Sequence, residues 1–224
     1  KAVLLEKPLA DTLERARRLA EAIRVEGVAS MLMLTWRYSA SGRKFVADAP
    51  QLDPVGARAV FLTGALLGGP FATPWRKQFG ALFDLGPHVI DFLDAALGTV
   101  IDVHATGSRL GWFSLAMVHD IGAVIDLALC ANLRSDALVA SVDVHGRNGS
   151  AGFDAATTMA PDTFATVADE FVAIVAGATT SLDADHGLRF QELIDRADRP
   201  TQPRRSIDVD ADTYRVSEGG SVEL

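Results

Sequence analysis

The spacing of hydrophobic residues in the first part of the chain predicts a strand, a helix and a second strand. Residues 1–5 form a short apolar run, and apolar residues then recur at helical spacing from Leu13 to Ile23. Asp11 is placed to cap this helix and Gly27 to end it. A nearly continuous apolar run from Val28 to Thr35 predicts a strand that is buried on both faces. This order of elements is typical of an α/β protein.

In the middle of the chain the hydrophobic period changes from that of a helix to that of a strand. Residues 39–56 are polar and predict a connection that could contain a short helix, and Ala59 to Leu66 predict a strand. Leu82 to Leu97 predict a helix that Gly98 closes. Beyond it, alternating segments predict short strands at 101–106, 115–118, 123–131 and 139–145, and a further short strand after a turn at 146–149. Short strands with short links indicate an antiparallel or mixed sheet.

The last part of the chain predicts two more helices. Their apolar stripes run from Phe164 to Val175 and from Phe190 to Ala197. From Arg199 onward the composition turns polar, which predicts an extended tail over the last residues.

Composition and charge exclude several classes of protein. The chain of 224 residues is 49% hydrophobic and 22% charged, which is ordinary for a globular protein and unlike a disordered one. No apolar run reaches the roughly 18 residues of a membrane span. The net charge of −8 argues against nucleic acid or an anionic membrane surface as a partner. A single cysteine, Cys130, excludes an internal disulfide and a thiolate zinc cluster. Neither a signal-peptide pattern nor metal-ligand spacing is present, so we expect a cytoplasmic protein without a metal site.

Glu6, Lys7 and Pro8 stand where the first predicted strand ends. In an open α/β sheet, ligands bind outside the carboxyl ends of the strands. Lys7 could there hydrogen-bond a substrate hydroxyl or favour an anionic alkoxide. The alternative is an exposed lysine at the end of a strand. A cis Lys7–Pro8 bond would fix the direction of this lysine.

Asp84 and His88 are four residues apart and share a face if the helix has begun by Asp84. A histidine can take the proton of an alcohol as a hydride leaves its carbon, and a carboxylate beside it can fix its tautomer or bind the substrate. In the alternative interpretation, Asp84 caps the helix, Pro87 lies in the first turn and His88 is a partly buried core residue. Asp91 and Asp94, further along, are expected on the solvated face of the helix.

Trp75 and Arg76 precede this helix in a predicted loop. A tryptophan and an arginine that lead into a polar helix start could line a ligand pocket. The alternative is a surface loop that Trp75 anchors to the core.

Three segments of the chain together resemble one protein family. Residues 3–10 (VLLEKPLA) are similar to its Glu-Lys-Pro segment, and residues 185–192 (DHGLRFQE) to its closing helix. Trp75-Arg76 followed by residues 80–91 (GALFDLGPHVID) is similar to its most characteristic helix. The family is that of glucose–fructose oxidoreductase and inositol dehydrogenase (Gfo/Idh/MocA), and the resemblance spans residues 1–197.

The resemblance implies an α/β (α+β) fold class in which a large, mostly antiparallel sheet carries helices on one face. Residues 1–27 would be a remnant of a Rossmann domain for NAD or NADP, residues 28–197 the substrate and oligomerisation domain, and residues 198–224 a polar tail. The glycine-rich unit that cradles the cofactor phosphates is missing from the sequence, so we expect a fragment that is inactive alone. A homo-oligomer through the sheet face is expected, because the strands from Leu115 to Ala131 are apolar on one face.

The resemblance also implies roles for the candidate residues. Lys7 and His88 would be the catalytic pair, with His88 as the acid–base group on the hydroxyl of a sugar or polyol. Asp84 would bind or orient the substrate. Glu6 to Pro8 would lie beside the cofactor, with Lys7 near the nicotinamide, and Trp75 and Arg76 would line the substrate side.

Two functions from different classes are therefore expected. One is an NAD(P)-dependent oxidoreductase that transfers a hydride between the nicotinamide and a hydroxyl-bearing carbon of a sugar, polyol or related small molecule. The other is a non-catalytic sheet domain for association or sugar binding. A hydrolase built on Asp84 and His88 would lack a nucleophile.

Overall fold

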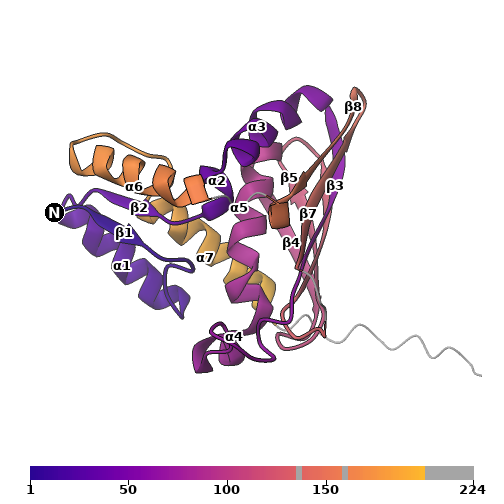
Figure 1. Cartoon of the computed structure of the whole chain (residues 1–224), viewed down its shortest axis with the longest axis horizontal. Helices are drawn as coiled ribbons and strands as arrows, with labels where there is room; N and C mark the ends of the chain where they lie inside the picture. The colour runs from indigo at the N-terminus through magenta and orange to yellow at the C-terminus, as the bar shows by residue number, and fades with distance from the viewer. Residues whose placement is uncertain (135–137, 158–160, 200–224) are drawn as a thin grey trace, which may run out of the picture.

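Two sheets of different size lie at opposite ends of the molecule, with helices between them (Figure 1). The structure is a computed structural model that describes residues 1–134, 138–157 and 161–199. The expected polar tail lies outside these residues beyond position 199. Among the described helices, none is long and apolar enough to cross a membrane.

The small sheet confirms the predicted strand–helix–strand order. Strands β1 (Val3–Leu5) and β2 (Ser30–Leu32) pair in parallel, and α1 (Leu13–Val25) connects them. The predicted cap of α1 is wrong by one residue, because the side chain of Thr12, not of Asp11, accepts a hydrogen bond from the N–H of Arg15. Both strands are also shorter than the apolar runs that predicted them.

The polar connection does contain helices. After β2 the chain forms α2 (Thr35–Tyr38), α3 (Ala40–Asp48) and the 3₁₀ turn η1 (Ala49–Leu52). These short helices lead the chain across from the small sheet to the large one (Figure 1).

The large sheet has six strands in the order β4-β5-β6-β3-β7-β8. All neighbours pair antiparallel except β3 and β6, which are parallel. The predicted fold class, with a large and mostly antiparallel sheet, is thereby confirmed. The strand bounds are β3 Pro54–Leu62, β4 Val100–Gly107, β5 Phe113–His119, β6 Val124–Cys130, β7 Val139–Gly146 and β8 Gly149–Asp154.

Four longer helices complete the fold, and the short 3₁₀ turn η2 (Ala155–Thr157) follows β8. They are α4 Pro74–Asp84, α5 Gly86–Leu97, α6 Pro161–Val175 and α7 Ala184–Asp198. Helices α5 and α7 cover the inner face of the large sheet (Figure 1). The predicted stripe of α7 from Phe190 to Ala197 is buried, whereas Phe164, Val172 and Val175 of the α6 stripe are exposed.

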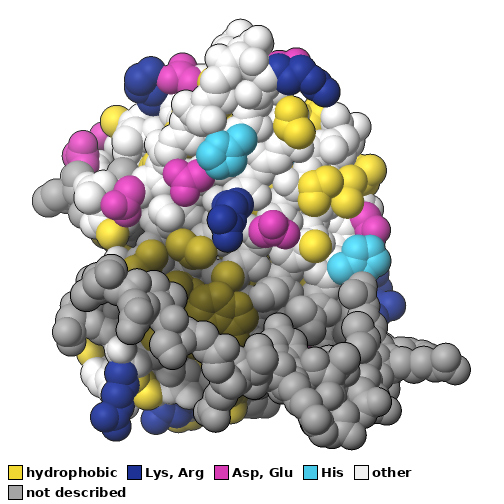
Figure 2. All heavy atoms as spheres, turned by 90° about the vertical axis from the view of Figure 1, so that its right-hand side faces the viewer, with side chains coloured by type: hydrophobic (Ala, Val, Ile, Leu, Met, Phe, Trp, Pro, Cys, Tyr) yellow, Lys and Arg dark blue, Asp and Glu magenta, His cyan; other side chains and the backbone are white. Residues whose placement is uncertain are grey.

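The two faces of the large sheet differ sharply in chemistry. Leu115, Met117, Ile125, Leu127 and Leu129 point inward and are buried against the helices. The outer face is mixed in chemistry: Figure 2 shows acidic, basic, histidine and hydrophobic side chains on it, some of the hydrophobic ones gathered in a hollow. The expectation that the strands from Leu115 to Ala131 offer an apolar face for association is therefore wrong, because the helices of the same chain already cover that face.

The alternation along β4 is interrupted. Val100 and Val103 are buried while Ile101 is 55% exposed, so the strict alternation predicted over residues 101–106, which would place Ile101 and Val103 on one face, fails at its start. The pairing of β4 with β5 shifts between Val100 and Asp102, and such a bulge reverses the alternation of side chains.

Candidate active site

The carboxyl end of β1 meets the junction of α4 and α5. The Lys7 ammonium lies 3.0 Å from Asp84 Oδ1 and also donates to the backbone carbonyl of Asp84. The Arg76 guanidinium donates from Nε to Asp84 Oδ2 at 3.0 Å. Because each carboxylate oxygen faces a different cation, Asp84 holds Lys7 and Arg76 at fixed positions although they are distant in sequence.

A kink in α4 brings Asp84 to this position. Gly80 has φ +71° and ψ −166°, and a Cβ there would lie 2.1 Å from the carbonyl oxygen of Arg109, so only glycine fits. The chain resumes helical geometry after Gly80 and ends α4 at Asp84. The alternative in which Asp84 caps the following helix is wrong, because its carboxylate binds Lys7 and Arg76, and α5 begins without a side-chain cap.

His88 lies in the first turn of α5, beside two aromatic rings that stack on each other. The ring of Trp36 is roughly parallel to the imidazole at a centroid distance of 6.2 Å, and Phe61 lies 6.5 Å away. Nδ1 of His88 is buried and has no hydrogen-bond partner within the described part of the chain. The imidazole is therefore a largely buried group with one nitrogen that its described surroundings leave without a partner.

Burial lowers the pKa of both basic groups of the site, whereas neighbouring charges act on them in opposite directions. Burial lowers the pKa of Lys7 below its ordinary value, although the Asp84 carboxylate opposes this shift. Burial also lowers the pKa of His88 well below its ordinary value, and the positive charge of Lys7 adds to the effect. His88 is consequently neutral near pH 7 and able to accept a proton.

These groups open into one cavity of about 440 Å³. It is lined by Glu6, Lys7, Met33, Thr35, Trp36, Phe61, Thr63, Ala65, Phe71, Arg76, Asp84, Leu85, His88, Leu138, Ala140, Ala155 and Phe164. Five predicted site residues thus share the cavity: Glu6, Lys7, Arg76, Asp84 and His88.

Two predicted site residues do not line this cavity. Trp75 packs against Phe79, with ring centroids 5.5 Å apart, and anchors the start of α4 to the core. Pro8 does not line the cavity either. Its peptide bond with Lys7 is cis, the isomer considered from the sequence.

A second polar cluster that sequence reasoning missed lies behind His88. Asp91 is fully buried, and its Oδ1 accepts from Arg37 Nη1 at 2.9 Å and lies 2.7 Å from His186 Nε2. Asp94 binds Arg189 and the N–H of Val100. The expectation that Asp91 and Asp94 solvate an outer helix face is wrong, because α5 is packed on all sides.

This buried cluster supports the position of His88. Arg37 follows Trp36 on α2, and Asp91 follows His88 by three residues on α5. The Arg37–Asp91 ion pair and the Trp36–His88 contact therefore hold α2 against α5 at adjacent positions. The only signal for it in the sequence was that Asp91 and Asp94 interrupt an otherwise apolar helix.

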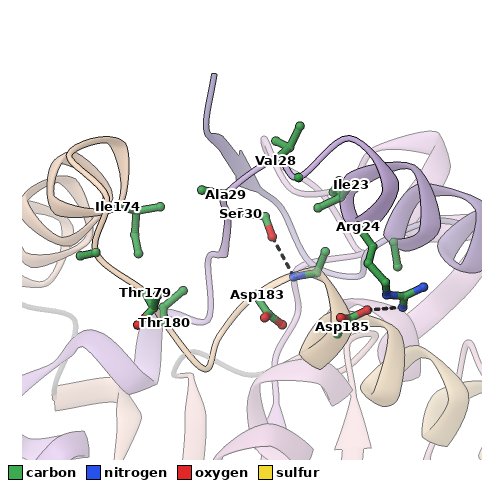
Figure 3. A pocket seen from close by; sticks show the side chains of 14 residues that line it. Ile23, Arg24, Val28, Ala29, Ser30, Ile174, Thr179, Thr180, Asp183 and Asp185 are labelled. Carbon is green, nitrogen blue, oxygen red and sulfur yellow. Dashed lines mark hydrogen bonds and ion pairs between the residues drawn. The ribbon is translucent and has the colours of Figure 1, made fainter.

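Another hollow, of about 250 Å³, lies between α1, β2 and the start of α7 (Figure 3). Its polar groups bind one another: Ser30 accepts from the N–H of Ala184 at 3.0 Å, and Arg24 donates to Asp185 at 2.6 Å. Asp183 caps α7 by accepting from the N–H of His186. This hollow therefore offers few free groups for chemistry, unlike the cavity around His88.

Comparison with known proteins identifies the fold. A search for matching family models found none, and a search of curated proteins found no match. Levoglucosan dehydrogenase in complex with NADH matches with a TM-score of 0.74 and 17% identity over 88% of this chain and 70% of that chain. UDP-N-acetylglucosamine 3-dehydrogenase from Acidithiobacillus ferrooxidans matches with a TM-score of 0.72 and 17% identity over 88% and 69%.

An oxidoreductase domain protein from Kribbella flavida gives a similar match, with a TM-score of 0.72 and 18% identity over 87% of this chain and 71% of that chain. Identities this low establish the fold and not the reaction. The chain therefore has the fold of these oxidoreductases, with the cavity around His88 as its candidate active site.

Proposed function

We propose that this chain belongs to an NAD(P)-dependent oxidoreductase of the Gfo/Idh/MocA type. The reaction would transfer a hydride between the nicotinamide and a hydroxyl-bearing carbon of a sugar, polyol or related small molecule. The observation that carries the proposal is the convergence of Lys7, Asp84 and His88 on one cavity. The fold is shared with dehydrogenases, two of which are named for sugar substrates, and this supports the same reaction class.

In this proposal His88 accepts the proton of the substrate hydroxyl. Its lowered pKa keeps the imidazole neutral, and the ring lines the cavity, where a substrate hydroxyl can reach it. The Lys7 ammonium stabilises negative charge that develops on the substrate oxygen. Asp84 orients Lys7 and Arg76, and its oxygens keep lone pairs that can accept from a second substrate hydroxyl.

The described residues can face the nicotinamide ring of a dinucleotide, but they offer no site for its phosphates. Glu6, Lys7 and Met33 border the cavity where β1 ends, and this edge can face a flat nicotinamide ring. No glycine-rich loop between a strand and a helix occurs in the sequence, so we propose that the phosphates are bound outside residues 1–199. When bound, NAD or NADP supplies the hydride acceptor or donor.

The test is turnover by the natural polypeptide that contains this chain. With NAD⁺ or NADP⁺ and a panel of sugars and polyols, we expect a substrate-dependent change in nicotinamide absorbance. His88→Ala should lower the rate by about 10²–10⁴-fold, as is usual for loss of a general acid–base group. Lys7→Ala should also abolish most of the activity, whereas His145→Ala on the outer face of the sheet should leave it unchanged. Unaltered turnover in both site variants would refute the proposal.

We also propose that the outer face of the large sheet mediates self-association. Small side chains there, such as Ser114, Ala116 and Ala128, leave a shallow hollow of about 990 Å³ beside the half-exposed Trp112. Strand pairing places Arg58 between Asp126 and Asp143, so the face has charges of both signs for a partner. Sedimentation equilibrium of the wild type and of Ala116→Arg should show a dimer or larger assembly that the substitution dissociates. A monomeric wild type would exclude association and leave the catalytic proposal intact.

A further inference from the structure

We propose that the substrate is a hydroxylated molecule with a hydrocarbon body, and not a sugar or polyol with a hydroxyl on every carbon. This inference rests on the proposed function and narrows its substrate class. It comes from the uneven distribution of polar groups around the cavity, which are concentrated at one end and already bind one another.

Several hydrogen-bonding groups at the polar end of the cavity bind one another. The two carboxylate oxygens of Asp84 accept hydrogen bonds from Lys7 and Arg76, and Lys7 also donates to the backbone carbonyl of Asp84. Thr63 Oγ1 accepts from the N–H of Ala65 at 3.2 Å. What remains for a ligand is the imidazole of His88, the third donor of Lys7, the outer donors of Arg76, the Glu6 carboxylate and the hydroxyls of two threonines in the lining. Of these, His88 and the Lys7–Asp84–Arg76 cluster can together bind one hydroxyl or two adjacent hydroxyls.

The opposite wall of the cavity is apolar. Phe61 and Ala140 are directly paired across β3 and β7, and Trp36 stacks on Phe61 at 5.5 Å. Phe164 of α6 and Leu138 continue the same wall toward the opening, and they are 52% and 42% exposed. A ligand whose hydroxyl reaches His88 therefore places the rest of its body against carbon atoms.

This wall discriminates between ligands by the cost of desolvation. Each ligand hydroxyl pressed against the wall loses its hydrogen bonds to water and finds no partner, which is unfavourable. A CH₂ group at the same place gains about 0.8 kcal/mol from burial. Aromatic stacking alone would also suit a sugar, but a sugar additionally needs polar partners around its rim, and the described residues of this wall provide only the indole N–H of Trp36.

Two probe ligands with the same six-membered carbon ring distinguish a ligand with a hydrocarbon body from one with a hydroxyl on every carbon. Cyclohexane-1,2-diol has two adjacent hydroxyls and an otherwise hydrocarbon ring, while myo-inositol has a hydroxyl on every ring carbon. Binding is measured by saturation-transfer NMR without cofactor, so that the readout does not depend on turnover. We expect the diol to bind at least about tenfold more tightly than inositol. Equal affinities, or tighter binding of inositol, would overturn the inference.

Two substitutions on α6 locate the binding. Phe164→Gln makes the wall polar at an exposed position where folding is not at risk, and should weaken diol binding by about three- to tenfold. Val172→Gln is the matched control, because Val172 is 66% exposed on the same helix and does not line the cavity. Unchanged diol binding in Phe164→Gln, or an equal loss in both variants, would also overturn the inference.

The outcome for the substrate class is distinguishable from that for the proposed function. If inositol is bound preferentially and oxidised with NAD(P), the hydrocarbon-body inference fails while the oxidoreductase stands. If the diol is bound preferentially at the wall defined by Phe164 but no alcohol is oxidised by the natural polypeptide, the inference on ligand class holds and the proposed reaction fails.

Discussion

Two buried carboxylates seven positions apart, Asp84 and Asp91, occupy very different surroundings. Asp84 faces the cavity and binds Lys7 and Arg76, whose side chains are 12% and 27% exposed. Asp91 is enclosed by α2, α5 and α7, and one of its oxygens has no hydrogen-bond partner in the described part of the chain. The difference teaches that burial of a charge by itself does not mark a catalytic group. What distinguishes the Asp84 cluster is its access to a cavity that also contains an unpartnered imidazole.

The largest expected effect on stability is at Asp91. Asp91→Ala should lower the free energy of unfolding by about 3–5 kcal/mol, because it leaves the buried Arg37 guanidinium without its partner. Urea denaturation of the folded chain measures this. Glu170→Ala, which breaks an exposed ion pair with Arg43, is the control and should cost at most about 1 kcal/mol. Similar losses in the two variants would contradict a structural role for Asp91.

A smaller loss of stability is expected at Asp84. Asp84→Ala should cost about 1–3 kcal/mol, because the cavity lets water reach the Lys7 ammonium that loses its partner. In a double-mutant cycle with Lys7→Met, the two changes should couple by about 0.5–3 kcal/mol, so that the pair costs less than the sum of the two. Additive losses would show that the ion pair does not form, and a loss larger than at Asp91 would reverse the comparison.

The two clusters also differ in how far the sequence predicts them. Lys7, Asp84 and His88 were predictable because each belongs to a short segment with a recognisable pattern. The partners of Asp91 were not, because Arg37 and His186 lie 54 and 95 residues away and meet it only through packing. The outward expectation for Asp91 followed the rule that charged residues are exposed, which fails on a helix whose apolar residues surround it.

Other elements show the same limit. The order of the strands and of most helices followed from hydrophobic spacing. Alternation identified the apolar face of the large sheet, although not that helices of the same chain cover it. The kink at Gly80 did not, because the sequence predicts a loop before Leu82 where the structure has α4, and nothing in it indicates that the carbonyl of Arg109 approaches Gly80 from another segment. This local break decides where Asp84 points, so its role became visible only with the tertiary contacts.

The smallest expected effect is on the pH dependence of stability, to which His88 contributes. The pKa of His88 is lowered by folding, so the unfolded chain takes up a proton below about pH 6.5 that the folded chain does not. The contribution of His88 to the free energy of unfolding is fully present above that pH. Below it, this contribution falls by about 1.4 kcal/mol per pH unit until the pKa of the folded state is reached.

His88→Asn should remove the part of this pH dependence that is due to His88. The measurement is the free energy of unfolding, obtained by urea denaturation at several pH values between 6.5 and 5. The pKa of His119 is likewise lowered by burial, so His119→Asn should remove a separate share, and the double variant should show the sum. A slope that His88→Asn leaves unchanged would mean that this imidazole is not held neutral by its surroundings.

The most direct test of the account is an NMR titration of the His88 imidazole in the folded chain. If Lys7, Asp84 and His88 form one electrostatically coupled site, the ring stays neutral well below the ordinary histidine pKa. The pKa should then rise in Lys7→Met, because the positive charge that disfavours the imidazolium is gone. An imidazole that titrates at its ordinary pKa and does not respond to Lys7→Met would contradict the account.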